Sequence, residues 1–373
     1  MRDLLDRLPA QFFTGILQAA AEARAQPGER FIDLGRGNPD LPPPPEAIEA
    51  VREAMLHTVD PTVHGYPPFQ GMPELREAIA ARYLADHGVE LDPEREVAVV
   101  PGTKTGIMLV TLACAGPGDD VLLPDPGYPD YHSAVALAGA RYVPLPMDEA
   151  AGWQPVFEGA RGALAALNFP SNPCAVLAAD GTMEEAVSWA HERRSWLVHD
   201  LAYGFLGFTR RARSILEVPG AREVATELWS PSKIYGMAGW RVGFLLGNAE
   251  VVGRVRTLVD HMFAGVPVAI QRGLLAALTG DQAHVAERRE RYRARRDVLV
   301  DAVPGLRRPE GSFYAWWQLP DELTPEEIVR RARVGVAPGV GFGSRGAGHV
   351  RLSLAVPDDD VAEGAARLGA LVS

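Results

Sequence analysis

The spacing of apolar residues predicts alternating helices and strands along the central part of the chain. Leu75, Ile79 and Tyr83 recur every four residues in residues 73–87, where a proline stands at the first turn and a glycine follows the end. The apolar run at residues 97–100 is short and bounded by turn residues, which is typical of a buried strand. The same patterns predict further strands at residues 121–123, 196–199 and 224–229, and further helices at residues 11–25, 105–115 and 182–194.

This alternation of strand, helix and strand indicates an α/β fold. Such an order favours a mostly parallel central sheet with helices on both faces. The helix at residues 182–194 begins with Thr182 and Glu185, which have the spacing of a capping box. We therefore expect the Thr182 hydroxyl to cap that helix.

The last part of the chain follows a different pattern and predicts a second, smaller domain. Residues 281–301 form an arginine-rich helix in this interpretation, and the arginine run at residues 287–296 is expected to be a solvated helix face. Strand-like and helical segments then follow in an α+β order, with strands at residues 312–319 and 350–354 and helices from residues 324 and 358. We expect a large domain at residues 46–280, a small C-terminal domain at residues 281–373, and an N-terminal segment at residues 1–45 that packs on the small domain.

Composition and charge exclude several classes of protein. Lys and Arg number 37 and Asp and Glu number 48, which gives a net charge of −11 and no clustered basic surface for nucleic acid. No apolar run approaches the roughly 18 residues needed to span a bilayer, and the first residues lack the apolar core of a signal peptide. Cys114 and Cys174 are too few for a disulfide framework and have no metal-ligand spacing, so we expect no metal site. The sequence predicts a cytoplasmic enzyme or binding protein that interacts with neither nucleic acid nor membrane.

The segment around Lys233 contains the strongest chemical signal. Lys233 follows a predicted strand and lies beside Ser230 and Ser232, with Arg241 eight residues further on. Hydroxyls and a guanidinium suit a phosphate dianion, and the neighbouring amine could form a Schiff base with an aldehyde. Taken alone, the segment is equally compatible with a solvated lysine on a glycine-rich loop.

Three other segments carry weaker signals. Asp200 ends a predicted buried strand, where ligands bind in α/β sheets, although an aspartate there also commonly caps a helix. An ionised Asp200 could keep a pyridine nitrogen protonated, and the neighbouring His199 could tune it or simply pack in the strand. Residues 168–173 form a polar, proline-rich loop that is typical of a turn. Residues 101–106 join a strand to a helix, whose first N–H groups could bind an anion or merely form a connection.

Taken together, the order of these motifs resembles the pyridoxal-phosphate-dependent aminotransferases of class I and II, which have fold type I. The similar residues extend from residue 35 to Arg351 and include Gly-Thr-Lys, Asn-Pro, Asp-x-x-Tyr and Ser-x-Ser-Lys followed by Gly-x-Arg-x-Gly. The resemblance implies pyridoxal 5'-phosphate as cofactor, an amino acid and a 2-oxo acid as substrates, and a homodimer with shared active sites.

The resemblance also implies roles for individual residues. Lys233 would bind the cofactor covalently and later move a proton, Asp200 would pair with its pyridine nitrogen, and Tyr203 would bind its phenolic oxygen. Asn172 would share that oxygen and lie beside the substrate, while Arg351 and Gly37 would bind the substrate α-carboxylate. The other cofactor contacts implied are Gly102, Thr103, Lys104, Ser230, Ser232 and Arg241 at the phosphate, Tyr128 stacked on the ring, and Tyr66 reaching the phosphate of the neighbouring subunit. One departure is Cys174 followed by Ala175, where the family commonly has threonine and glycine.

The substrate is less specified than the reaction. Residues 8–13, 123–131 and 199–204 resemble bacterial aminotransferases of methionine salvage, which aminate 2-oxo-4-methylthiobutanoate. Alternatives within the fold are aminotransferases of diaminopimelate, aspartate or alanine type, and a carbon–sulfur β-lyase. A regulator of this fold would need an N-terminal DNA-binding domain, for which about 30 residues leave no room.

The N-terminal segment could contribute to substrate preference. Phe12, Phe13 and Ile16 give it an apolar face at helical spacing. Because the resemblance places this segment over the substrate entrance, we expect a neutral, fairly apolar substrate. The alternative is that these side chains only pack the segment onto its own domain.

Overall fold

The central sheet is mostly parallel, as the alternating pattern predicted. The computed structural model describes residues 5–57 and 59–372. Within these residues the sheet has eight strands, in the order β2 (Val97–Val100), β9 (Gly243–Gly247), β8 (Ala225–Trp229), β7 (Trp196–Asp200), β6 (Leu164–Asn168), β3 (Asp120–Asp125), β4 (Arg141–Asp148) and β5 (Gln154–Pro155). β9 is antiparallel to both of its neighbours and β5 to β4, whereas β8, β7, β6, β3 and β4 run parallel. The predicted α/β fold class is therefore confirmed.

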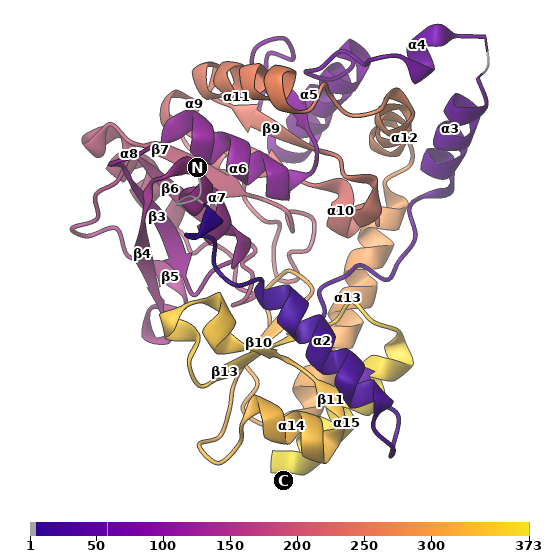
Figure 1. Cartoon of the computed structure of the whole chain (residues 1–373), viewed down its shortest axis with the longest axis vertical. Coiled ribbons are helices and arrows are strands. Elements are labelled where there is room, and N and C mark those ends of the chain that lie inside the picture. Colours follow the sequence, from indigo (N-terminus) through magenta and orange to yellow (C-terminus); the bar gives the residue numbers. More distant parts are fainter. Residues whose placement is uncertain (1–4, 58, 373) are drawn as a thin grey trace.

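Alternating side chains of each strand enter two separate apolar cores, one on each face of the sheet. In β2, Ala98 and Val100 belong to one core and Val97 and Val99 to the other, as the two-residue period of a strand requires. One face is covered by α6 (Thr103–Cys114), α7 (Asp130–Ala138) and α11 (Ala249–Met262), and the other by α5 (Pro73–His87) and α8 (Thr182–Arg193). At the edge, α12 (Val268–Thr279) packs against α3 (Pro45–Leu56) and α5 (Figure 1). Short helices connect these elements, at α4 (Pro61–His64), α9 (Ala221–Val224) and α10 (Pro231–Ile234).

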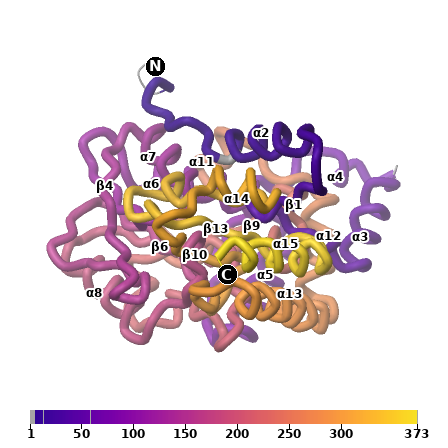
Figure 2. The backbone as a smooth tube through the Cα atoms, turned by 90° about the horizontal axis from the view of Figure 1, so that it is seen from below, coloured from indigo at the N-terminus to yellow at the C-terminus, as the bar shows by residue number. Residues whose placement is uncertain are grey.

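A smaller α+β unit lies at the lower end of the view in Figure 1. Its antiparallel sheet has the order β10 (Tyr314–Gln318), β13 (His349–Ser353), β12 (Ala337–Pro338). The helices of this unit are α13 (Ala283–Ala302), α14 (Pro325–Ala332) and α15 (Asp358–Val372). α13 and α15 lie side by side in contact, as Figure 2 also shows.

The N-terminal residues contact this smaller unit. α2 (Phe12–Ala25) packs Ala20 and Ala23 near Val329 of α14, and β1 (Ile32–Asp33) pairs in parallel with β11 (Val334–Gly335). The Arg30 guanidinium forms an ion pair of 2.6 Å with Asp360 of α15. The domain boundaries at residues 45 and 280 stay predictions.

Of the helices in residues 5–57 and 59–372, none combines the length and apolar character that crossing a bilayer requires.

Two local expectations are wrong for physical reasons. Thr182 does not cap α8, because the helix begins after Gly181 in a left-handed conformation and the Thr182 hydroxyl instead donates to Gln154 Oε1 at 3.0 Å. The arginine run of α13 is not a fully solvated face either. The Arg295 side chain is buried and donates to Asp40 at 2.8 Å and to Asp358 at 2.6 Å, so it joins α13 to the N-terminal segment and to α15.

Candidate active site

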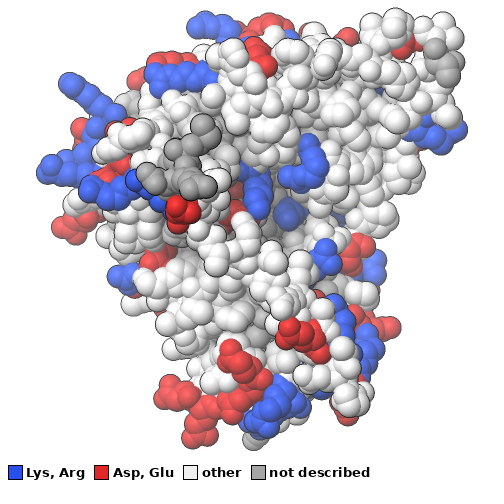
Figure 3. Space-filling model, viewed as in Figure 1, with Lys and Arg blue, Asp and Glu red and all other residues white. Residues whose placement is uncertain are grey.

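The predicted site residues converge on a cavity of about 420 Å³ between the sheet edge and the smaller unit. The carboxyl ends of β6, β7 and β8 meet there with the beginning of α6, as expected for neighbouring parallel strands. Lys and Arg side chains are visible in the hollow at the centre of Figure 3. The predicted residues that line the cavity are Gly37, Thr103, Lys104, Tyr128, Asn172, Asp200, Tyr203, Ser230, Ser232, Lys233, Arg241 and Arg351.

The beginning of α6 and the Arg241 guanidinium form one end of the cavity. Gly102 precedes α6 with a φ of +80°, and a Cβ at this position would collide with the Arg241 guanidinium. Ser230 caps the short helix α10 by accepting from the Ser232 N–H at 3.2 Å. The first-turn N–H groups of a helix, two hydroxyls and a guanidinium are the donors that an anionic group such as a phosphate requires.

Lys104 lies at this end but its ammonium is already paired. Its Nζ is 2.9 Å from Asp130 Oδ2 at the start of α7. A contribution of Lys104 to anion binding would therefore come from its backbone N–H in the first turn of α6, and this role stays a prediction.

Asp200 is held at the end of β7 by three groups. Its Oδ2 accepts from the Tyr131 hydroxyl at 2.8 Å, and its Oδ1 accepts from the Ala202 N–H at 3.2 Å. Asn168 donates to the Asp200 carbonyl at 2.8 Å and fixes the backbone. Burial raises the pKa of Asp200 because it disfavours the charged form, while the bond from Tyr131 acts in the opposite direction.

Lys233 ends inside the protein near aromatic rings. Its Nζ lies 5.9 Å from the centre of the Tyr203 ring and 5.6 Å from that of Phe313. Burial lowers the pKa of Lys233, and the nearby positive charges of Arg351 and Arg241 act in the same direction. A larger share of this amine is therefore neutral, and hence nucleophilic, than in a solvated lysine.

Arg351 connects three parts of the chain at the opposite end of the cavity. It is fully buried in β13 and donates to Asn172 Oδ1 at 2.9 Å and to the Gly35 carbonyl at 3.0 Å. The Tyr314 ring packs on the guanidinium at 4.0 Å, and a Cβ at Gly37 would collide with the Tyr314 hydroxyl. The close approach of the backbone at Gly37 thus requires glycine.

The departure at Cys174 and Ala175 leaves Asn172 in place. Asn172 still lines the cavity, and its N–H donates to Asn168 Oδ1 at 2.7 Å. Ala175 adopts a φ of 58°, a left-handed conformation that glycine adopts more easily. The loop therefore keeps a backbone shape suited to glycine and tolerates the strain of a Cβ.

Two predicted residues lie outside this arrangement. Tyr66 is 85 % exposed and does not line the cavity of its own chain. His199 points away from Asp200, as successive strand residues do, and its Nδ1 lies 2.6 Å from the buried Glu227. His199 is thus packed in the strand rather than placed beside the Asp200 carboxylate.

Among residues 5–57 and 59–372, no group of three His, Cys, Asp or Glu side chains could hold a metal ion.

Comparison with known proteins identifies the family. Residues 29–368 match the family described as aminotransferase class I and II. This chain belongs to that family. The chain is 38 % identical to the L-glutamine–4-(methylsulfanyl)-2-oxobutanoate aminotransferase of Bacillus subtilis, over 99 % of this chain and 95 % of that protein.

Two other relatives agree with this assignment. The aminotransferase is 39 % identical to an LL-diaminopimelate aminotransferase of Desulforudis audaxviator, over 97 % of this chain and 95 % of that protein. It superposes on the substrate-bound structure of BacF, a Bacillus subtilis transaminase, with a TM-score of 0.92 and 37 % identity, over 100 % of this chain and 97 % of that one. The predicted fold type and enzyme class are confirmed.

Several cavity residues of this aminotransferase escaped the sequence analysis. Tyr131 stands three residues after Tyr128, a spacing that puts both side chains on the same face of a helical turn, so a signal for it existed. Tyr314 and Arg36 carry no comparable signal. They reach the cavity only through the pairing of β10 with β13 and through the fixed turn at Gly35.

The apolar side chains of α2 contact two different parts of the protein. The Phe12 ring packs edge-on against Phe342 of the smaller unit at 5.2 Å, which supports the packing alternative. Ile16 lines the cavity together with Leu17, which the sequence analysis did not single out. The side chain of Phe13 lies outside the described part of the structure.

Tyr131→Phe tests whether the hydroxyl supports an ionised Asp200. The Tyr131 hydroxyl lowers the pKa of Asp200, so its removal leaves the effect of burial less opposed and the pKa of Asp200 rises further. Because a carboxylate with a raised pKa becomes protonated at higher pH, the acidic limb of the kcat/KM profile should move to higher pH. At neutral pH, kcat/KM should fall about tenfold.

Tyr142→Phe is the matched control, since Tyr142 lies on β4 outside the cavity. Its pH profile should coincide with that of the parent enzyme. An unshifted acidic limb in Tyr131→Phe would show that this hydrogen bond has no influence on the ionisation that activity requires.

Proposed function

We propose that this chain is a pyridoxal-phosphate-dependent transaminase in which Lys233 holds the cofactor. The observation that carries the proposal is the placement of an amine of lowered pKa, a buried carboxylate and a helix start with free N–H groups around one cavity. The composition adds support, because the sequence contains 35 arginines but only two lysines, Lys104 and Lys233, and both line this cavity. Arginine cannot replace lysine where an amine must lose its proton.

The residues present fit this cofactor. Glycine at position 102 leaves room for the Arg241 guanidinium at the start of α6. The phosphate would bind beside that guanidinium, with donors from Thr103, Lys104, Ser230, Ser232 and Arg241. Asp200 would face the ring nitrogen, Tyr128 would lie along the ring, and Tyr203 with Asn172 would bind the phenolic oxygen. Bound there, pyridoxal phosphate would supply an aldehyde for an amine and a protonated ring that withdraws electrons from the substrate α-carbon.

The opposite end of the cavity would orient the substrate. The Arg351 guanidinium would bind the α-carboxylate through two parallel hydrogen bonds, beside the Gly37 backbone. This anchor would hold the α-carbon hydrogen toward Lys233, whose amine would accept the proton and return it one carbon away. One amino acid becomes a 2-oxo acid and one 2-oxo acid becomes an amino acid, so the exchange needs no external oxidant or reductant.

The walls of the cavity favour an apolar side chain on one substrate. Ile16 and Leu17 of α2 and Ile107 of α6 contribute this apolar surface. A relative that uses 4-(methylsulfanyl)-2-oxobutanoate, named with L-glutamine, supports methionine's 2-oxo acid as the substrate. Burying a methylthioethyl chain would contribute about 1.5–3 kcal/mol, which is enough for a preference of tens-fold.

Lys233 can be tested directly as the attachment site. The purified protein should be yellow, and borohydride reduction should fix the cofactor to the peptide that contains Lys233. Because the sequence has only one other lysine, mass spectrometry of two peptides gives the answer. Lys233→Ala should lower kcat at least about a hundredfold, whereas Lys104→Ala should keep the label on Lys233. Label on Lys104, or unchanged turnover of Lys233→Ala, would refute the assignment.

The substrate preference follows from kcat/KM values for a panel of 2-oxo acids with glutamate or glutamine as donor. We expect 2-oxo-4-methylthiobutanoate to exceed pyruvate and oxaloacetate by about tenfold or more. A clear preference for oxaloacetate would point to an aspartate-type enzyme. Release of pyruvate from cystathionine without any added 2-oxo acid would point to the β-lyase instead.

We also propose a homodimer in which Tyr66 serves the cofactor of the neighbouring subunit. The strongly exposed position of Tyr66, outside the cavity of its own chain, supports this role. The cytoplasmic location inferred from the sequence stays a prediction.

Mixing Lys233→Ala with Tyr66→Phe tests the sharing of active sites. A hybrid dimer would then hold one site with both Lys233 and Tyr66 intact, and random exchange of subunits should restore about a quarter of the parent activity. If Tyr66 served its own subunit, no hybrid would contain an intact site and mixing would restore nothing.

A further inference from the structure

Arg36 occupies a constrained turn at the substrate end of the cavity. On one side, the Gly35 carbonyl accepts from Arg351 at 3.0 Å; on the other, Gly37 lies against Tyr314. Because both neighbours are fixed, the Arg36 side chain leaves the turn from a defined position beside the proposed carboxylate anchor. It lines the cavity and is exposed to solvent.

The charges around the cavity leave Arg36 unmatched. Under the proposed function, Arg241 faces the phosphate, Lys233 the cofactor and Arg351 the α-carboxylate, while Lys104 is paired with Asp130 at 2.9 Å. Asp200 is the acidic side chain among the lining residues and would face the ring nitrogen. Among the described residues, Arg36 forms no ion pair or side-chain hydrogen bond, so its positive charge remains available to a ligand.

The surroundings of Arg36 are compatible with two kinds of substrate. Ile16 and Leu17 of α2 line the same cavity and offer apolar contact to a neutral side chain. An exposed guanidinium stays hydrated when such a chain is bound, so it imposes little penalty. A side chain that ends in a carboxylate could instead pair with it through charge-assisted hydrogen bonds.

We propose that Arg36 binds the distal carboxylate of a dicarboxylic substrate, an α-amino or 2-oxo acid with a second carboxylate at the end of its chain. The inference rests on the proposed function. It concerns the substrate of the other half-reaction, the amino acid or 2-oxo acid that exchanges its amino group with the apolar substrate. Arg36 is then a specificity-determining residue, and it favours glutamate over its amide glutamine as the amino donor. Two guanidinium groups, Arg351 and Arg36, would receive the two carboxylates of one molecule.

Binding without turnover tests the pairing in the holoenzyme. Glutarate and pentanoate each have five carbons, but only glutarate has a second carboxylate. The ratio of their dissociation constants, measured by calorimetry, therefore gives the contribution of that carboxylate. We expect the parent enzyme to bind glutarate about tenfold more tightly than pentanoate, with a smaller difference at high salt. Arg36→Gln should reduce the difference to about twofold or less, and Arg36→Lys should keep part of it.

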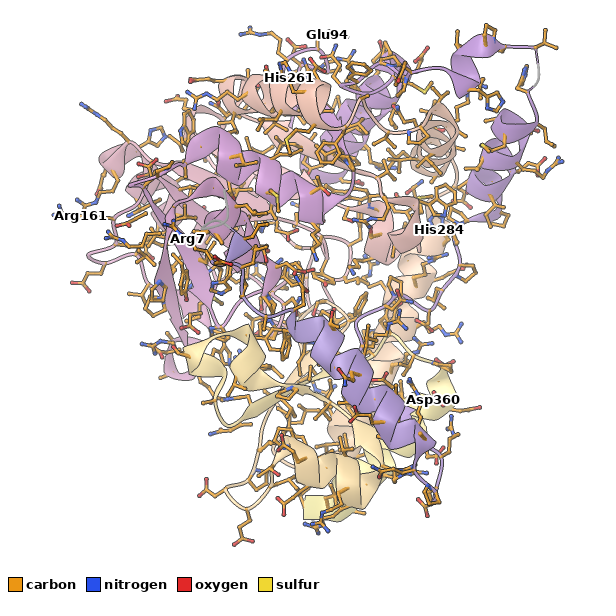
Figure 4. All side chains as sticks on the ribbon, in the orientation of Figure 1. Arg7, Glu94, Arg161, His261, His284 and Asp360 are labelled. Atoms are coloured by element: carbon orange, nitrogen blue, oxygen red, sulfur yellow. The ribbon has the colours of Figure 1, made fainter. Side chains whose placement is uncertain are left out.

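Arg161→Gln is the matched control for loss of one arginine. Figure 4 shows Arg161 at the outer edge of the large sheet, away from the cavity. This variant should retain the parent preference for glutarate. The inference is overturned if Arg36→Gln keeps that preference, or if it weakens glutarate and pentanoate equally.

Steady-state rates separate this inference from the proposed function. Arg36→Gln should lower kcat/KM for 2-oxoglutarate about tenfold and change that for 2-oxo-4-methylthiobutanoate less than about twofold. Absence of transamination by the parent enzyme with every pair of substrates would refute the proposed function, while the binding data would still report on Arg36. Equal losses for both 2-oxo acids would refute the role of Arg36 alone.

Discussion

The buried Arg351 guanidinium is the contact on which the geometry of the cavity depends. It extends from the small sheet to Asn172 on the loop after β6 and to the carbonyl of Gly35 in the N-terminal segment. Segments more than a hundred residues apart in sequence are thereby held in one orientation. Because a buried cation is costly to leave without hydrogen bonds, the native arrangement of all three segments is favoured together. The Tyr314 ring on the guanidinium completes this junction.

The parallel strands supply the other half of the arrangement. β6, β7 and β8 end at one edge and deliver polar side chains there, while their apolar residues stay in the two cores. Burial at that edge moves the pKa of Asp200 upward and the pKa of Lys233 downward, so both groups are shifted toward their neutral forms. At Asp200, the hydrogen bond from Tyr131 opposes this shift. The same burial therefore favours the neutral form of Lys233, while the Tyr131 hydroxyl and the Ala202 N–H partly oppose its effect on the pKa of Asp200.

Sequence patterns predicted the elements and most of the lining residues because both depend on local signals. The strand at residues 97–100 and the helix at residues 73–87 end where the sequence indicates. The prediction for Thr182 was wrong because two features without a local sequence signal decide its hydrogen bond. The backbone at Gly181 is left-handed, and the side chain of the distant Gln154 accepts from the Thr182 hydroxyl. Tyr314 and Arg36 were missed because strand pairing and a tertiary turn place them. Periodicity gives no information about such long-range contacts.

The scarcity of lysine has a practical consequence for the chemistry of this protein. Aldehydes, activated esters and other amine-directed reagents would meet two side-chain amines, both in the same cavity, of which Lys233 is half-buried and Lys104 is ion-paired. The other basic side chains, apart from histidines, are arginines, whose guanidinium groups do not form stable imines and keep their charge beyond pH 12. Pyridoxal phosphate added in excess to test the proposed function would therefore meet few side-chain amines besides Lys233. Immobilisation or fluorescent labelling through surface lysines would need an amine introduced by mutation.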